Sequence, residues 1–153
     1  MTPSIRPSIR DATPADVPAL LDLVRETGTL DLHTPYTYWT LTHAGLVLVA
    51  ERDGRLVGLL TALRACEPDR LFLWQVGLLA ALRGTGLAQR LLDAFLAHAR
   101  ALRTRSIDLT IAPGNAASRA MMERFCARHG LSMVATGETF GPASEETLFA
   151  IGL

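Results

Sequence analysis

The sequence has few cysteines and no pattern that would put them to chemical use. Cys66 and Cys126 are the two cysteines in 153 residues, and they match neither the spacing of metal ligands nor a disulfide framework. We therefore expect two packed thiols, no metal site and a reducing, cytoplasmic location.

The sequence also has no excess of charge and no long apolar run. Fifteen basic and fifteen acidic residues give a formal net charge of zero, so no overall field gathers nucleic acid or an anionic membrane. No apolar run approaches the roughly 18 residues of a membrane span, and residues 1–10 lack the apolar core of a secretion signal. We expect neither nucleic acid nor a membrane as a partner.

What remains is the composition of a globular protein. The chain is 49% hydrophobic and 20% charged, and 153 residues suffice to bury a proper core. We expect one domain over residues 1–153, of which about 1–7 form a flexible lead-in. Any anion site must then be local.

Apolar periodicity and turn signals predict an α+β fold. The Asp53-Gly54 pair predicts a hairpin between two antiparallel strands. The predicted strands are Ser8–Asp11, Leu46–Arg52, Leu56–Ala65, Leu71–Leu78, Ser106–Ala112, Ser132–Phe140 and Thr147–Gly152. The predicted helices are 13–28, 34–45, 87–102 and Ala116–Arg128. This order predicts a mixed, mostly antiparallel central sheet flanked by helices on both faces, with two meandering hairpins before a crossover.

The most informative stretch is an apolar strand that runs through a glycine turn into a helix. Gly84 and Gly86 let the backbone turn tightly, and the helix near Leu87 presents unpaired N–H groups and its positive dipole end. Pyrophosphate is the natural ligand, although an ordinary strand-to-helix turn remains an alternative. A dinucleotide fold is a lesser alternative, because Gln89 replaces its third glycine and Asp108 precedes a strand instead of ending one.

With Arg83-Gly84-Thr85-Gly86-Leu87-Ala88 in this context, the chain resembles the GCN5-related N-acetyltransferase superfamily. The resemblance implies acetyl-CoA as cosubstrate, with the pantetheine arm paired to β-strand residues and the pyrophosphate on the turn. It also implies that Asn115 contacts CoA, although Asn115 alone reads equally well as a helix cap. The implied cofactor residues are Val76, Gly77, Leu78, Arg83, Gly84, Thr85, Gly86, Leu87, Ala88 and Asn115.

One departure concerns proton donation. The tyrosine that often protonates the leaving thiolate in that superfamily is replaced here by Met121 or Met122. Because a thiol has a pKa not far above neutrality, water or no acid at all can suffice.

Three separated segments resemble a narrower family, the L-2,4-diaminobutyrate acetyltransferases of ectoine biosynthesis. They are Leu30–Tyr38, Leu73–Gly77 and Pro113–Arg119. The resemblance implies acetylation of the side-chain amine of diaminobutyrate, and homodimers by analogy. The alternatives are another small amine, a peptide amine, or a non-catalytic acyl-CoA-binding module.

Such a substrate carries two ammonium groups and a carboxylate, so its site needs anions and an aromatic face. By the resemblance Asp31, Trp74 and Glu146 line it; a capping residue, a core tryptophan and a solvated charge are their plainer readings. Glu146 is the candidate base, and a backbone N–H near Val76 or Leu78 stabilises the oxyanion.

A second departure precedes Glu146. The related enzymes usually carry a histidine within a Gly-His-Glu stretch, and this chain has Gly141-Pro142-Ala143-Ser144-Glu145-Glu146. The substitution predicts altered efficiency or a different diamine.

Overall fold

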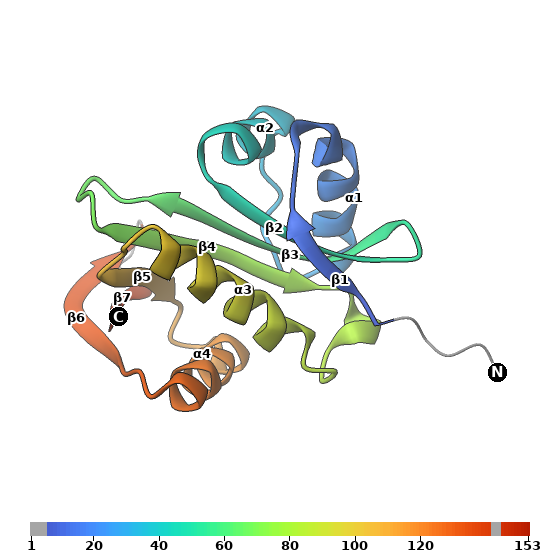
Figure 1. Ribbon diagram of the computed structural model, residues 1–153. Helices are drawn as coiled ribbons and strands as arrows, with labels where there is room; N and C mark the ends of the chain where they lie inside the picture. Colours follow the sequence, from blue (N-terminus) through green and yellow to red (C-terminus); the bar gives the residue numbers. More distant parts are fainter. Residues whose placement is uncertain (1–5, 142–144) are drawn as a thin grey trace. The chain divides into compact units, whose positions relative to one another are not determined.

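A computed structural model describes residues 6–141 and 145–153 as seven strands, four α-helices and two short 3₁₀ turns (Figure 1). The strands are β1 Ser8–Asp11, β2 Leu46–Arg52, β3 Arg55–Arg64, β4 Arg70–Leu78, β5 Ser106–Ile111, β6 Met133–Phe140 and β7 Glu146–Gly152. The helices are α1 Val17–Thr27, α2 Pro35–Ala44, α3 Leu87–Ala101 and α4 Ala116–His129, and the 3₁₀ turns are Pro14–Asp16 and Ala80–Leu82. Each predicted strand and helix is present.

The strands are hydrogen-bonded in the order β1-β2-β3-β4-β5-β7-β6, and only the β4–β5 pair among the described registers is parallel. The predicted α+β class with a mixed, mostly antiparallel sheet is confirmed. The chain divides into two compact units, Met1–Leu63 with Gln75–Phe95 and Arg64–Trp74 with Leu96–Leu153. β4 contributes residues to both units, and the single-domain expectation stays a prediction.

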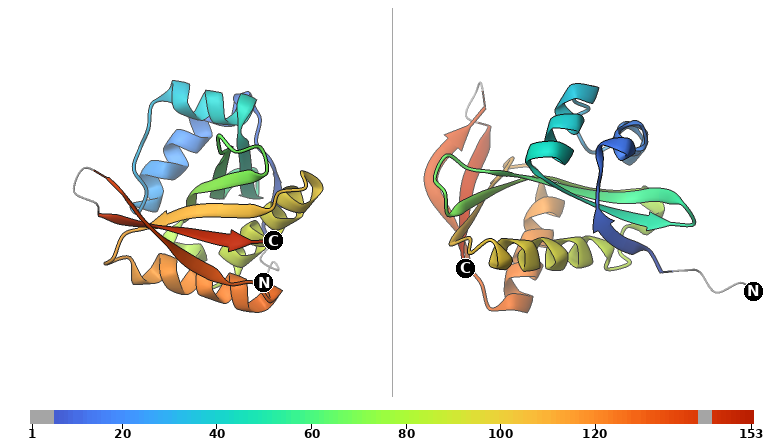
Figure 2. Two further views of the ribbon diagram at one scale, coloured as in Figure 1. Left: turned by 90° about the vertical axis from the view of Figure 1, so that its left-hand side faces the viewer. Right: turned by 45° about the horizontal axis from the view of Figure 1, so that its top comes forward.

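In the first unit, β1, β2 and β3 form an antiparallel meander. The hairpin between β2 and β3 turns at Asp53 and Gly54, whose φ angles of 53° and 74° match the predicted turn. Helices α1 and α2 cover one face of these strands, and the beginning of α3 covers the other (Figures 1 and 2). Buried side chains of α1, α2, β2 and β3 form the core on the first face, and Tyr38 is its largest member.

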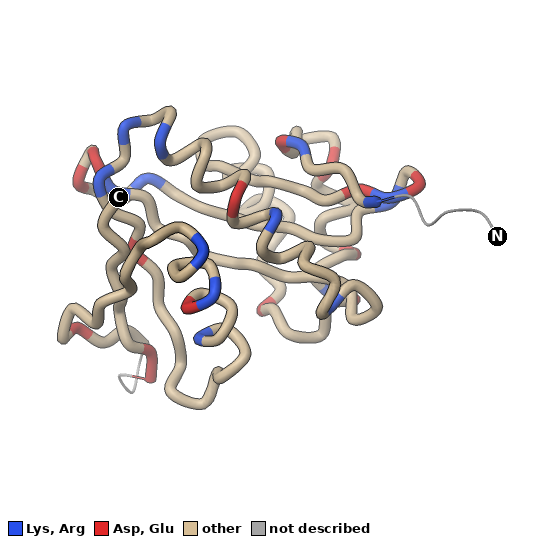
Figure 3. The backbone as a smooth tube through the Cα atoms, turned by 60° about the horizontal axis from the view of Figure 1, so that its bottom comes forward, with Lys and Arg blue, Asp and Glu red and all other residues tan. Residues whose placement is uncertain are grey.

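Helix ends in this unit follow their capping residues. The Thr34 hydroxyl accepts a hydrogen bond from the Thr37 N–H and begins α2. Gly28 ends α1 at a φ of 65°, a conformation that glycine adopts without strain. Acidic and basic residues are scattered along the chain (Figure 3), and Arg10 joins Asp16 and Glu51 at 2.8 Å each.

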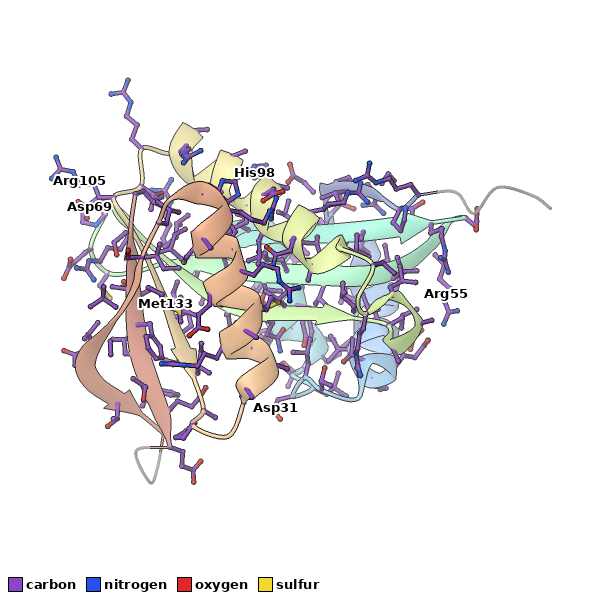
Figure 4. All side chains as sticks on the ribbon, turned by 90° about the horizontal axis from the view of Figure 1, so that it is seen from below. Asp31, Arg55, Asp69, His98, Arg105 and Met133 are labelled. Carbon is purple, nitrogen blue, oxygen red and sulfur yellow. The ribbon has the colours of Figure 1, made fainter. Side chains whose placement is uncertain are left out.

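In the second unit, β4 pairs in parallel with β5, and β5, β7 and β6 continue antiparallel. Arg70 holds the buried carboxylate of Asp108 through two hydrogen bonds of 3.2 Å. A longer pair joins Arg105 to Asp69 at 3.8 Å (Figure 4). Helix α4 packs against β6.

Two local predictions are wrong. Leu102 was predicted as the last residue of the helix 87–102, but α3 ends at Ala101 and Leu102 is 48% exposed. The expectation of two packed thiols is right for Cys126, which is buried, and wrong for Cys66, which lies exposed after β3.

Residues 1–5 of the predicted lead-in lie outside the described residues. At its other end, the carbonyl of Pro7 accepts a hydrogen bond of 2.8 Å from Arg90. Across the described ranges, none of the helices has the length and apolar character needed to cross a bilayer.

Candidate functional site

The glycine turn has the backbone geometry of an anion site. Gly84 and Gly86 have φ angles of 74° and 84°, and a Cβ on either would point into open space. The Arg90 N–H donates to the Gly86 carbonyl at 3.1 Å as the helix begins. The N–H groups of Leu87 and Ala88, at the beginning of α3, come before the first hydrogen bond of this kind and can donate to a phosphate.

Side chains around the turn stabilise it from within. The Thr85 hydroxyl donates to the carbonyl of Leu82 at 2.6 Å. Arg83 Nη2 donates to the carbonyl of Thr27, the last residue of α1, at 2.7 Å. Leu87 is buried and Ala88 half-buried, so these two residues would offer a ligand their backbone.

β4 pairs with β3 along one edge, and its described register with β5 along the other edge ends at Phe72. Among the described residues, the register between β4 and β5 covers Arg70–Phe72 and Ser106–Asp108. Val76, Gly77 and Leu78 lie further along β4 and outside this register. An extended ligand can therefore bind there as an added strand, which is the prediction for the pantetheine arm.

Gln75 is a residue of the site that the sequence reasoning missed. It is 5% exposed on β4, and its side chain lies between two groups from outside the strand. Gln75 Nε2 donates to the backbone carbonyl of Asp31 at 3.2 Å, and the hydroxyl of Tyr38 donates to Gln75 Oε1 at 3.4 Å. The sequence does contain a signal for it. Leu73, Gln75 and Gly77 are two residues apart and so share one face of the strand, and Gln75 is a polar residue on this inward face.

Because Gly77 has no side chain, the segment that contains Leu30 and Asp31 can pack closely against β4. A Cβ on Gly77 would stand 2.5 Å from Leu30 Cδ1 and 3.3 Å from Thr27 Cγ2. Leu30 therefore packs directly on the β4 backbone, one residue before Asp31. Asp31 itself is exposed in the connection between α1 and α2 (Figure 4).

The aromatic residues near this segment differ in burial. Tyr38 is fully buried, whereas Trp39 is 42% exposed and its ring stacks at 5.0 Å on that of His43. Trp74 on β4 is 37% exposed, which excludes the plainer reading of a core tryptophan.

Asn115 lies at the beginning of α4 beside a hollow in the second unit. Its Oδ1 accepts a hydrogen bond of 3.1 Å from the Ser118 N–H, so the plainer reading as a helix cap is correct. The Nδ2 group is then what Asn115 can offer a ligand. The hollow has a volume of about 350 Å³ and is lined by Ile111, Ala112, Pro113, Asn115, Arg119, Ala135, Thr147 and Phe149.

Glu146 begins β7 and is half-buried. Its Oε1 accepts a hydrogen bond of 3.1 Å from the hydroxyl of Thr110 on β5. Thr147 and Phe149 line the hollow beside Asn115, and side chains alternate along a strand. Glu146 therefore lies on the opposite face of β7 from the Asn115 hollow.

The two departures from the family patterns fall in different surroundings. Met122 is 2% exposed and lies on the buried side of α4. Ala143 and Ser144, where the related enzymes carry a histidine, lie outside the described residues. Within residues 6–141 and 145–153, no three His, Cys, Asp or Glu side chains group as metal ligands.

Comparisons with known proteins agree on one family. Residues 17–127 match the acetyltransferase (GNAT) family model. An L-2,4-diaminobutyric acid acetyltransferase from Streptomyces avermitilis is 38% identical over 144 residues, which cover 91% of this chain and 75% of the relative.

Solved structures show the same likeness. The diaminobutyrate acetyltransferase EctA from Paenibacillus lautus, in complex with L-2,4-diaminobutyric acid and coenzyme A, is 28% identical with a TM-score of 0.84, over 96% of this chain and 95% of that one. The PaiA N-acetyltransferase from Thermoplasma acidophilum shares the fold, with a TM-score of 0.79 at 12% identity over 97% and 100% of the two chains.

Proposed function

Because this chain belongs to the acetyltransferase (GNAT) family, and within it to the L-2,4-diaminobutyric acid acetyltransferases, we propose that it acetylates the side-chain amine of L-2,4-diaminobutyrate with acetyl-CoA. The observation that carries this function is the match, over nearly the whole chain, to a structure that holds both diaminobutyrate and coenzyme A. The product is the precursor that a cyclising enzyme converts to ectoine.

Direct transfer in a ternary complex suits these groups. The nitrogen lone pair of the neutral amine attacks the thioester carbonyl carbon, the carbon–sulfur bond breaks, and the CoA thiolate leaves. The nitrogen gives up a further proton to water as it becomes an amide. An alkylammonium has a pKa of about 10, so one proton must leave before attack. The Glu146 carboxylate, directly or through water, is the proposed acceptor of that proton.

The cofactor roles rest on backbone more than on side chains. The proposed pyrophosphate site is the glycine turn with the first N–H groups of α3, and the proposed pantetheine site is the backbone of Val76–Leu78, beyond the register of β4 with β5. An N–H of Val76 or Leu78 then faces the thioester oxygen and stabilises the developing oxyanion. Asn115 Nδ2 is the proposed side-chain donor to CoA.

Asp31, Trp74 and Glu146 are the proposed amine-binding residues. Two carboxylates and an aromatic ring suit a substrate with two ammonium groups. Because neither Met121 nor Met122 carries an acidic proton, solvent water is the proposed proton donor to the leaving thiolate.

We also propose a cytoplasmic homodimer. The two cysteines are free thiols, as is usual for proteins of a reducing compartment. The measured mass in solution, from light scattering, tests the dimer: a monomer mass at assay concentrations refutes it.

The deciding experiment is CoA-thiol release from acetyl-CoA with L-2,4-diaminobutyrate, beside ornithine, lysine, spermidine and a peptide. The chain has no lysine, so acetyl groups found after the reaction belong to the added amine and not to its own lysines. We expect strong preference for diaminobutyrate, with NMR placing the acetyl group on the side-chain nitrogen. Turnover of another amine alone would identify a changed substrate, and binding of acetyl-CoA without turnover would identify an acyl-CoA-binding module.

A further inference from the structure

We propose that Gln75 is a positioning residue for the amine substrate: it holds the segment Thr29–His33 against β4 and so fixes where the Asp31 carboxylate meets the amine. This inference rests on the proposed function. It concerns a residue that touches neither reacting group and acts through Asp31.

The side-chain amide of Gln75 is buried, and burial of an amide is unfavourable unless partners satisfy it. Gln75 is 5% exposed, and a buried side-chain amide without partners destabilises a fold by a few kcal/mol. An apolar residue would serve β4 equally well at this inward position, between Leu73 and Gly77. The two partners explain why an amide is present here, since its Oε1 and its Nε2 each form a hydrogen bond with a group outside β4.

The partners differ in what they accomplish. The Gln75 Nε2 donor reaches the carbonyl of Asp31, 44 residues away in sequence, so it ties an exposed connection to the central strand. Tyr38, on α2, orients the amide by donating to Oε1. Burial raises the pKa of Tyr38, so its hydroxyl stays protonated and remains a donor at neutral pH.

A second, apolar contact holds the same segment. Leu30 packs where a side chain at position 77 would stand, and Arg83 holds the carbonyl of Thr27 at the end of α1. Residues 27, 30 and 31 are therefore fixed at three successive points. Gln75 provides the point next to the Asp31 carboxylate, the group proposed to bind the amine.

Hydrogen bonding of this kind supports the geometry of Asp31 without contributing charge. Removal of the Gln75 amide leaves the Asp31 carboxylate in the protein but no longer fixes the position of its backbone. Diaminobutyrate binding should then weaken, while acetyl-CoA binding should not, because the proposed cofactor contacts are made by the glycine turn and by the backbone of Val76–Leu78.

The test is a double-mutant cycle with Gln75→Met, which keeps the length of the side chain, and Asp31→Ala. We expect Gln75→Met to raise the KM for diaminobutyrate about tenfold, the equivalent of about 1.4 kcal/mol, with the KM for acetyl-CoA changed less than about twofold. On the Asp31→Ala background the same change should add less than about twofold. If Gln75→Met changes both KM values equally, or if its effect on the KM for diaminobutyrate is undiminished in the Asp31→Ala background, Gln75 has a structural role only.

Thr61→Val is the matched control. Thr61 is fully buried, and its hydroxyl accepts a hydrogen bond of 3.2 Å from the backbone N–H of Gln75. The substitution removes a buried hydrogen bond of the same residue but leaves the Gln75 amide in place. It should lower the melting temperature without changing the ratio of the two KM values.

Amide hydrogen exchange tests the proposal without turnover. Gln75→Met should speed exchange in residues 29–33 and leave α3 unchanged, and unchanged exchange in 29–33 overturns the inference even if diaminobutyrate is the substrate. Tyr38→Phe, which keeps the Nε2 bond, should give a smaller acceleration in the same segment. A wild-type enzyme inactive on diaminobutyrate would instead refute the proposed function and leave the exchange result standing.

Discussion

At the scale of single residues, Gly77 shows how an absent side chain can place a neighbour. The strand alternation puts position 77 on the face that carries Gln75, and Leu30 occupies the space that a side chain would fill. The glycine was expected from the family pattern as a cofactor residue. The structure gives it a second role, in packing the segment that precedes Asp31.

Gly77→Ala should therefore impair both stability and amine binding. The added methyl group would stand 2.5 Å from Leu30 Cδ1, so Leu30 must shift, at a cost of about 1–3 kcal/mol in the free energy of unfolding. Urea denaturation and the KM for diaminobutyrate measure the two effects. Gly152→Ala is the control, since a Cβ there meets nothing within 4 Å; equal losses in both variants would contradict the packing role.

Asp16 makes the clearest pH-dependent contribution among the described residues. Hydrogen bonds from Arg10 lower its pKa from 3.8 to about 2. A carboxylate with a depressed pKa stabilises the fold fully above the unfolded value, and that stabilisation is lost as the pH falls from about 4 through about 2.

Asp16→Asn should lower the free energy of unfolding near neutral pH by about 1–2 kcal/mol, a figure reduced for the exposure of Arg10. The difference from wild type should shrink as the pH falls toward 2, as followed by urea denaturation at a series of pH values. Asp22→Asn removes an exposed pair with Arg25 and should change stability little. A constant difference across the pH range would refute the assignment to the Asp16 carboxylate.

At the scale of elements, caps and glycines made most helix and strand ends predictable. Thr34 and Gly28 mark helix ends by chemistry that acts within a few residues, and Asp53-Gly54 marks a hairpin in the same way. The end of α3 carries no such mark, because the chain turns at Arg103 with a φ of 56°. The result was the wrong placement of Leu102.

The candidate site was predictable only where its parts are contiguous in sequence. The glycine turn and the helix after it form one short segment, and their geometry agrees with the prediction. Gln75 depends on Tyr38, 37 residues away, and on a carbonyl, which every residue carries. Periodicity along one strand marks such a residue as unusual but cannot name its partners.

The beginning of α4 allows the two roles of Asn115 to be separated. Asn115→Asp keeps an oxygen to cap the Ser118 N–H and loses the Nδ2 donor, whereas Asn115→Ala loses both. We expect the aspartate variant to keep its stability while weakening acetyl-CoA binding. The alanine variant should lose about 1 kcal/mol of stability as well.

Calorimetry and acetyl-CoA titration measure these outcomes. If the aspartate variant binds acetyl-CoA as tightly as wild type, Asn115 is a cap and not a CoA ligand.

The glycine turn can be tested against another glycine that also has a positive φ angle. Gly86 and Gly130 have φ angles of 84° and 64°, and neither would bring a Cβ within 4 Å of another group. Alanine at either position should cost about 1–2 kcal/mol of stability through backbone strain. Only Gly86→Ala should weaken acetyl-CoA binding, by about tenfold, in isothermal titration; equal affinities in the two variants would place the pyrophosphate elsewhere.

At the scale of the whole molecule, β4 is shared between two compact units. Residues 70–74 belong to one unit and 75–78 to the other, so neither unit holds the complete strand. We therefore expect a single cooperative unfolding transition, as the single-domain prediction requires.

The two tryptophans make this expectation measurable, because Trp39 lies in the first unit and Trp74 in the second. Trp39→Phe and Trp74→Phe leave one fluorescent reporter in each unit. Their unfolding curves should each follow the far-ultraviolet circular dichroism of the same variant. A reporter that changes at a denaturant concentration where the dichroism does not would reveal two independently folding parts.

The first unit also brings substrate and cofactor functions to one strand. If pantetheine pairs with the Val76–Leu78 backbone while Gln75 and Gly77 anchor the segment that carries Asp31, a single strand sets the distance from acetyl carbon to bound amine. The enzyme then selects the diamine by its length, through a fixed distance along β4 and not through the closure of a mobile lid. One additional methylene, as in ornithine, would carry the reacting nitrogen past its target, and tolerance for longer amines would have to begin with a looser attachment at Gln75.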